Sequence, residues 1–96
     1  MCAKAELDRI EGQMEQAYRQ LIGMNAAEPN IQTAIKTAHM AWFTHRDAFL
    51  EAMWPGPNKD QQYGSSYPLL YGDARIKLTR QQIVALKDLI AEYTPR

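Results

Sequence analysis

The sequence has 96 residues, which is enough for one domain and too few for two. Apolar residues make up 46% of the chain, a share that is ordinary for a globular protein and too high for a disordered one. Lys plus Arg and Asp plus Glu number 11 each, so the chain lacks the basic excess of a nucleic-acid-binding protein or of a polybasic membrane-surface module. We expect a single domain over residues 1–96, with a flexible N-terminus over residues 1–4 and a loop over residues 54–67.

The cysteine and histidine content argues against the common structural cross-links. The single cysteine, Cys2, excludes an internal disulfide and a cysteine-based zinc site. His39 and His45 are six residues apart, which turns their side chains well apart around a helix. No apolar run approaches the roughly 20 residues of a membrane-spanning helix. We therefore expect no metal, no cofactor and no transmembrane helix.

Two amphipathic helices are predicted in the first half of the chain, because apolar residues recur there every three or four positions. The first covers about residues 5–24. The second begins near Asn30, whose side chain is suited to capping the first turn, and ends at residues 54–57, where two prolines and a glycine cannot continue a helix. The expected buried positions are Leu7, Ile10, Met14, Ala17 or Tyr18, and Leu21 in the first helix, and Ile31, Ile35, Ala38, Trp42, His45 or Arg46, Phe49 and Met53 in the second. The acidic residues of the first helix are expected on its solvated face: Glu6, Asp8, Glu11 and Glu15.

The second half of the chain is predicted to hold a long loop and one more helix. Residues 55–67 are rich in Pro, Gly, Asn, Ser, Gln and Tyr, and residues 67–72 are expected to form a helical turn or two. The last helix is predicted to begin at Thr79, which fits a capping box with Gln82, and Leu78 and Ile83 are placed for a hydrophobic staple. Its expected buried positions are Ile83, Leu86, Leu89 or Ile90, and Tyr93, and Pro95 ends it. These elements predict an all-α fold of three main helices, an antiparallel hairpin whose open side is closed by the last helix and the loop.

The segment of residues 41–47 on the central helix holds Trp42, Arg46 and Asp47. Trp42 and Arg46 are four residues apart, so they share a helix face and the guanidinium can lie on the indole. Asp47 lies ~100° further round the helix, where it can meet a basic residue of another helix or a backbone amide of the loop. We interpret the three residues as a structural motif that ties the loop and the last helix to the core, in preference to a recognition site. His45 has no nucleophile motif beside it, so we expect no catalysis.

The loop carries aromatic and small polar side chains that suit contact with a protein partner. Amphipathic aromatic side chains give contact area at low entropic cost, and hydroxyls add hydrogen bonds. The alternative is that Trp54 and Tyr67 fold back and cap a small core. The candidate partner-binding residues are Trp54, Tyr63, Ser65, Ser66 and Tyr67.

Several of these motifs together resemble a known family. Ala41-Trp42-x-x-x-Arg46-Asp47 resembles the central signature of the LprI-like lysozyme inhibitor family of small bacterial envelope proteins. The weaker matches, within a resemblance that spans about residues 7–90, are Glu11-x-x-Met14-Glu15-x-x-Tyr18-x-x-Leu21 to a family helix, Gly64-Ser65-Ser66 to a Gly-Gly-Ser-type loop, and Leu78-Thr79-x-x-Gln82-x-x-x-Leu86 to the last helix.

The chain departs from the family pattern where the family has a pair of cysteines. Leu50 and about Ala74 stand at those two places, so either packing replaces a bridge there or the match is offset by a residue. Gln82 stands where the family prefers Arg. The chain therefore resembles a divergent member without the family cysteines.

The resemblance implies a non-enzymatic binding protein of the bacterial envelope, periplasmic or anchored to the outer membrane, that occludes a cell-wall hydrolase such as lysozyme. Two alternatives stay open: an immunity-type protein that neutralises one dedicated toxin, and a structural or assembly module such as a helical dimer. Some family members are lipoproteins, which gives Cys2 a second interpretation as a lipidated residue instead of an ordinary free thiol. No signal peptide is visible in the chain. Many lysozymes are strongly basic and this chain is neutral, so charge steering requires that acidic residues cluster in the fold.

Overall fold

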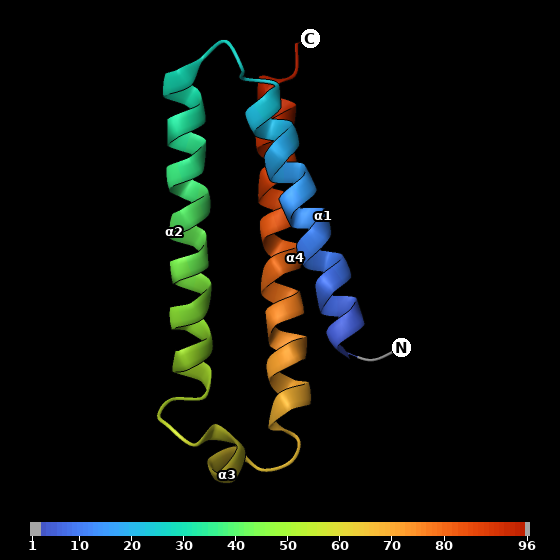
Figure 1. Cartoon of the computed structure of the whole chain (residues 1–96), viewed down its shortest axis with the longest axis vertical. Helices are drawn as coiled ribbons and strands as arrows, with labels where there is room; N and C mark the ends of the chain where they lie inside the picture. Colours follow the sequence, from blue (N-terminus) through green and yellow to red (C-terminus); the bar gives the residue numbers. More distant parts are fainter. Residues whose placement is uncertain (1–2, 96) are drawn as a thin grey trace.

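The structure is a computed structural model that describes residues 3–95, and within that range it contains helices and no strand. The helices are α1 (Ala3–Gly23), α2 (Pro29–Met53), α3 (Lys59–Tyr63) and α4 (Tyr67–Tyr93). Figure 1 shows the three long helices side by side, with α2 antiparallel to both α1 and α4, and the short α3 at the end of the bundle where α2 leads into α4. The predicted all-α class is confirmed.

The closest pair of helices is α1 and α4, which run parallel to each other (Figure 1), rather than the expected hairpin of α1 and α2. Small residues lie on the facing sides of this pair: Ala17 beside Ile83, Gly72 beside Leu7, and a fully buried Thr79. Small side chains let two helix backbones approach closely. On α2 the side chains that face the pair are large: His39, Trp42, Phe43 and Arg46.

One hydrophobic core joins all three long helices. The predicted buried side of α1 is confirmed at four positions, with Leu7 and Tyr18 half-buried beside them. On α4 the predicted Ile83 and Leu86 are buried, Ile90 is half-buried, and Leu89 and Tyr93 are exposed. The core consists of Ile10, Met14, Ala17, Leu21, Ile35, Ile83 and Leu86.

The buried side of α2 differs from the prediction by about one residue of rotation. The buried residues are Ile35, His39, Arg46 and Leu50. Three of the predicted positions are exposed instead: Ala38, Phe49 and Met53. The predicted Ile35 is buried, and of the two alternatives His45 and Arg46 it is Arg46 that is buried. The buried His39 was missed because it is polar, and a pattern of apolar residues does not reveal it.

The start of α2 also differs from the prediction. Pro29 stands in the first turn, Glu28 is the N-cap residue, and no side chain caps the helix, so Asn30 is not the cap. Proline suits this position because its fixed φ is helical and its missing N–H has no partner in a first turn. At the preceding helix end, the Asn25 amide donates to the Leu21 carbonyl at 2.9 Å.

The predicted start of the last helix at Thr79 is wrong. α4 begins at Tyr67, with Pro68 in its first turn, and continues through Gly72 to Tyr93. Thr79 lies in the middle of α4, where its hydroxyl donates to the Arg75 carbonyl at 2.8 Å. There is thus no capping box and no staple at this point, because packing against α1 carries the helix through a sequence that would otherwise suit a helix start.

The N-terminus and the loop differ from the prediction in their extent. α1 begins at Ala3, so two of the four residues expected to be flexible are helical, and Cys2 lies outside the described residues. The loop between α2 and α4 covers residues 54–66 and contains α3. None of the helices over residues 3–95 combines the length and the apolar character needed to cross a membrane.

Candidate functional site

The signature residue Arg46 sits at the centre of an ion cluster that joins three helices. Its side chain is 8% exposed, and its Nη1 lies 3.4 Å from Oε2 of Glu11 on α1. The same Glu11 oxygen accepts a hydrogen bond from Nη2 of Arg75 on α4 at 3.0 Å. Nη2 of Arg46 is 3.0 Å from Oδ1 of Asp47. Two guanidinium groups and two carboxylates therefore balance in charge at the point where α1, α2 and α4 meet.

Aromatic rings enclose the Arg46 guanidinium. Its Cζ atom lies 5.3 Å from the centre of the Trp42 ring and 5.2 Å from that of Phe43. Both distances are within the range of a cation–π interaction, which is stronger where the cation is removed from water. The predicted stacking of Arg46 on Trp42 is confirmed.

The partner of Arg46 on another helix was not predicted. We expected Asp47 to reach across to a basic residue or to the loop, but its carboxylate pairs with the adjacent Arg46 and is 65% exposed. Glu11 makes the link between helices instead, although the sequence pattern placed it on the solvated face of α1. Glu6 behaves similarly, because its Oε1 lies 2.8 Å from Nη2 of Arg80 on α4. The motif thus ties α2 to α1, and through Glu11 to α4, rather than to the loop.

A second buried polar residue, His39, joins α1 and α2. Its ring stacks on Tyr18 at 4.0 Å between ring centres and meets the edge of Phe43 at 4.9 Å. Nε2 lies 3.7 Å from Oε2 of Glu15, too far for a hydrogen bond, and neither ring nitrogen has a hydrogen-bond partner. Burial lowers the pKa of His39 below its ordinary value, although Glu15 acts in the opposite direction.

The loop after α2 is held in one shape by Lys59. Its Nζ lies 2.9 Å from Oε1 of Glu51, 2.5 Å from the Trp54 carbonyl and 2.6 Å from the Gly56 carbonyl. The Gly56 amide also donates to Glu51 at 2.8 Å. Lys59 and this amide hold the pKa of Glu51 below its ordinary value. The Lys59 ammonium thereby donates hydrogen bonds to loop carbonyls that have no hydrogen-bond donor within a helix.

An aromatic cluster packs under the same loop. The Trp54 ring lies 5.7 Å from the Tyr67 ring, which is 6.0 Å from the Tyr63 ring and 5.8 Å from the Tyr71 ring. The Tyr63 hydroxyl donates to the Pro55 carbonyl at 2.6 Å. This cluster matches the alternative that we considered for Trp54 and Tyr67, because both fold back onto the bundle and are half-buried.

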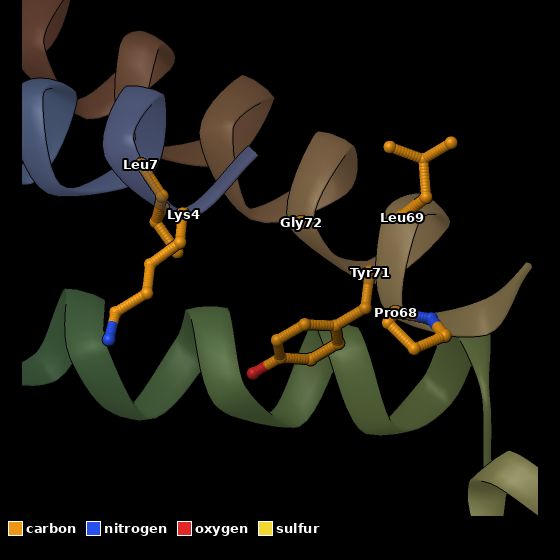
Figure 2. Close-up of a pocket in the computed structure, with 6 residues that line it drawn as sticks. All are labelled: Lys4, Leu7, Pro68, Leu69, Tyr71 and Gly72. Carbon is orange, nitrogen blue, oxygen red and sulfur yellow. The ribbon is translucent and has the colours of Figure 1, made fainter. Parts of the chain in front are cut away.

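The five candidate contact residues therefore lie together but differ in exposure. Trp54, Tyr63 and Tyr67 form the base of the loop, and the exposed Ser65 and Ser66 follow Gly64, whose φ of 86° favours glycine. Two hollows share Tyr71 of the aromatic cluster as a lining residue. One, of about 390 Å³, is shown in Figure 2, where Tyr71 points from α4 toward α2 and Leu69 points away. The other, of about 220 Å³, is lined by Asp47, Leu50, Glu51, Lys59, Tyr67 and Tyr71.

The candidate site contains no evident centre for metal chemistry. Among residues 3–95, no three His, Cys, Asp or Glu side chains gather closely enough to hold a metal ion. His45, the other histidine of α2, is exposed, and its ring lies 6.0 Å from that of Phe49.

A comparison with known families decides the relationship of this chain. The sequence model of the family described as lysozyme inhibitor LprI matches residues 1–86. The chain belongs to the LprI family. No curated protein and no solved structure matches the chain. The LprI family is one of lysozyme inhibitors, which is a protein-binding function.

Leu50 and about Ala74 are the two positions at which the sequence resemblance implies cysteines in other LprI proteins. Leu50 of α2 is 4% exposed and lines a hollow together with Tyr71 of α4. The half-buried Ala74 follows Tyr71 on α4 by about one helical turn. The first of the two positions is thus a buried apolar residue of α2 that faces the beginning of α4.

The ion cluster predicts a large cost for removing Arg46. Arg46→Ala should lower the free energy of unfolding by about 3 kcal/mol, because it leaves the Glu11 carboxylate without one of its cations and empties the space between two rings. Arg19→Ala is the matched control: Arg19 is 79% exposed and 3.6 Å from Glu15, so about 0.5 kcal/mol or less is expected. Urea unfolding followed by circular dichroism measures both, and equal effects would contradict the assigned role of Arg46.

His39 predicts a loss of stability in mild acid. Because its pKa is lowered in the folded state, the unfolded chain binds more protons as the pH falls from the ordinary value of 6.5, and the free energy of unfolding decreases. His39→Phe keeps the stack on Tyr18 and should remove the decrease between about pH 6.5 and pH 5, a window above the ordinary Glu value of 4.5. Thermal melts across this window test the prediction, which fails if both proteins show the same pH dependence.

Proposed function

We propose that this chain inhibits a lysozyme-type cell-wall hydrolase by covering its active cleft with the end of the bundle that carries residues 54–67. Family membership supports an inhibitor. We choose this end because its loop is preformed: Lys59 binds Glu51 and the loop carbonyls, and the Trp54 ring packs on Tyr67 of α4. A loop that is already ordered loses little conformational entropy on binding, so more of its contact energy appears as affinity.

The proposed contact residues are the five named from the sequence. Ser65 and Ser66 are exposed at the point where α3 turns into α4, and their hydroxyls are available to donate to the carboxylates of a hydrolase. Trp54, Tyr63 and Tyr67 are half-buried and contribute their exposed edges together with a rigid base.

Charge at this end also favours a basic enzyme. Residues 47–67 contain Asp47, Glu51 and Asp60 against a single basic side chain, Lys59. The acidic side chains are exposed, whereas the Lys59 ammonium is enclosed by loop carbonyls and Glu51. Because Asp47 is paired with Arg46 and Glu51 with Lys59, Asp60 is the acidic residue of this segment without an ion pair in the described chain, and it supports a modest attraction of a positively charged partner.

A lytic assay tests this function. Purified protein in excess should slow the lysis of bacterial cells by a lysozyme and form a stoichiometric complex in calorimetry. Replacing both serines, Ser65→Ala with Ser66→Ala, should weaken binding by about a hundredfold or more, since each lost hydrogen bond to a charged group is worth about 1.5 kcal/mol or more. Thr33→Ala with Thr37→Ala removes two exposed hydroxyls from the far end of α2 and should leave inhibition unchanged. Undiminished lysis without a detectable complex would refute the proposal.

We further propose that the protein acts in the bacterial envelope, held there by lipidation of Cys2. Cys2 lies outside the described residues, and the adjacent α1 begins at Ala3. The start of α1 lies toward the same end of the bundle (Figure 1), because Lys4 and Leu7 line one hollow with Pro68 and Tyr71 of α4, so an acyl chain at Cys2 would hold the 54–67 end close to the membrane surface. The intact mass of the protein isolated from its native membranes should exceed the mass of the unmodified chain by that of the acyl groups, and an unmodified thiol would contradict this proposal.

A further inference from the structure

The three long helices form a flat and extended molecule. The structure measures 51 × 28 × 16 Å, and its radius of gyration of 16.0 Å exceeds the ~12.5 Å expected of a compact domain of this length. Its accessible surface of 6573 Å² also exceeds the ~5600 Å² expected of a monomer of its mass. The excess is comparable to the ~800 Å² that each partner contributes to a stable protein interface.

The outer side of α4 carries the exposed stripe Lys77–Gln81–Val84–Asp88, with spacings of four, three and four residues. α1 does not cover this stripe, because it packs beside Ile83 on another side of α4. Val84 is 59% exposed, the highest value among the large apolar residues of the described chain. All four residues of the stripe are exposed.

The stripe has a positive charge at one end, Lys77, and a negative charge at the other, Asp88, so it is complementary to a second copy of itself that runs in the opposite direction. Lys77 and Asp88 lie on one face of α4 but are ~16.5 Å apart along the helix, so they cannot pair within one chain. Neither forms an ion pair with another residue in the described part of the chain. If two copies of α4 run antiparallel, Lys77 of each copy meets Asp88 of the other, which gives two ion pairs from one two-fold axis.

The shape of this face fits the same axis. A hollow of about 230 Å³ lies between α2 and α4, lined by His45, Phe49, Met53, Lys77, Leu78 and Gln81. The axis that pairs Lys77 with Asp88 passes between Gln81 and Val84, so the two Val84 residues lie ~4.5 Å apart along the helix direction and their side chains meet, while the hollow stays at the edge of the contact on the α2 side. The exposed apolar side chain of each copy thus meets that of the other, without a second choice of register.

We infer that a second copy of this chain packs on the outer side of α4, in an antiparallel two-fold dimer held by Lys77–Asp88 ion pairs and by contact between the two Val84 side chains. This inference does not depend on the proposed inhibitor function. The two 54–67 loops lie at opposite ends of the dimer, because the two α4 helices run in opposite directions.

The full chain tests the inference by its mass in solution, measured by light scattering and sedimentation equilibrium over a concentration series. We expect a species of twice 11.0 kDa that dissociates on dilution. Lys77→Asp alone and Asp88→Lys alone should each weaken association by more than about tenfold, because each places like charges opposite each other. An equimolar mixture of the two variants should associate again, because the mixed dimer restores both ion pairs. Lys36→Asp changes an exposed charge on α2 and serves as the matched control.

Several outcomes would overturn the inference. The wild-type protein remaining at monomer mass up to submillimolar concentration would do so. A dimer that is insensitive to Lys77→Asp and to Val84→Glu would show that another surface associates. Circular dichroism of each variant verifies that the helices are intact, and Val84→Glu should not unfold the protein because Val84 is exposed. Failure of the mixed variants to associate while the wild-type protein dimerises would reject the antiparallel pairing.

Discussion

The arrangement of the helices depends on one buried cation. Arg46 carries its charge into the interior from the middle of α2, and removing a guanidinium from water costs several kcal/mol unless charges and hydrogen bonds replace the lost hydration. Glu11, Asp47 and two aromatic faces supply that replacement. Because Glu11 belongs to α1 and also binds Arg75 of α4, all three helices must come to one place for the charge to be compensated. The cluster therefore links the choice of helix neighbours to the cost of a buried charge.

This explains the spacing of the signature residues in physical terms. The four-residue spacing from Trp42 to Arg46 stacks the guanidinium on the indole, and the planar fork of the arginine then points several N–H donors outward at fixed angles. A lysine at this position would supply a point charge but could not serve Asp47 and Glu11 together in this geometry. The residues by which the family is recognised thus belong to the framework, and the surface available to a partner lies elsewhere.

The loop depends on that framework without touching Arg46. Glu51 is slightly more than one turn beyond Arg46 on α2, and its carboxylate holds Lys59, whose ammonium gathers the carbonyls of Trp54 and Gly56. On the other side, Tyr67 and Tyr71 of α4 support the Trp54 ring. The loop is therefore attached at the end of α2 and at the beginning of α4. Any change in the separation of these two helices alters the surface that the loop presents.

The sequence by itself determined the helical class, the buried side of α1, the stacking of Arg46 on Trp42 and the family, because each is carried by residues close together in the chain. The position of the loop and its five candidate contact residues was also predictable, since prolines and glycines interrupt helices locally. The hydrogen bonds of Lys59 to Glu51 and to the loop carbonyls were not predicted, although the proximity of Glu51 and Lys59 in the sequence was a signal for them.

The start of α4 was mispredicted because Thr79 and Gln82 suit a helix start when considered alone. Only the tertiary structure decided that Thr79 is interior, that His39 is buried, that Arg46 rather than His45 is buried, and that Phe49 and Met53 are exposed. Each of these depends on a side chain from a distant segment: α1 covers Thr79, Tyr18 stacks on His39, and Glu11 compensates Arg46. Periodicity reveals which side of a helix is apolar, but a buried polar residue becomes favourable only when its partner arrives from elsewhere in the fold.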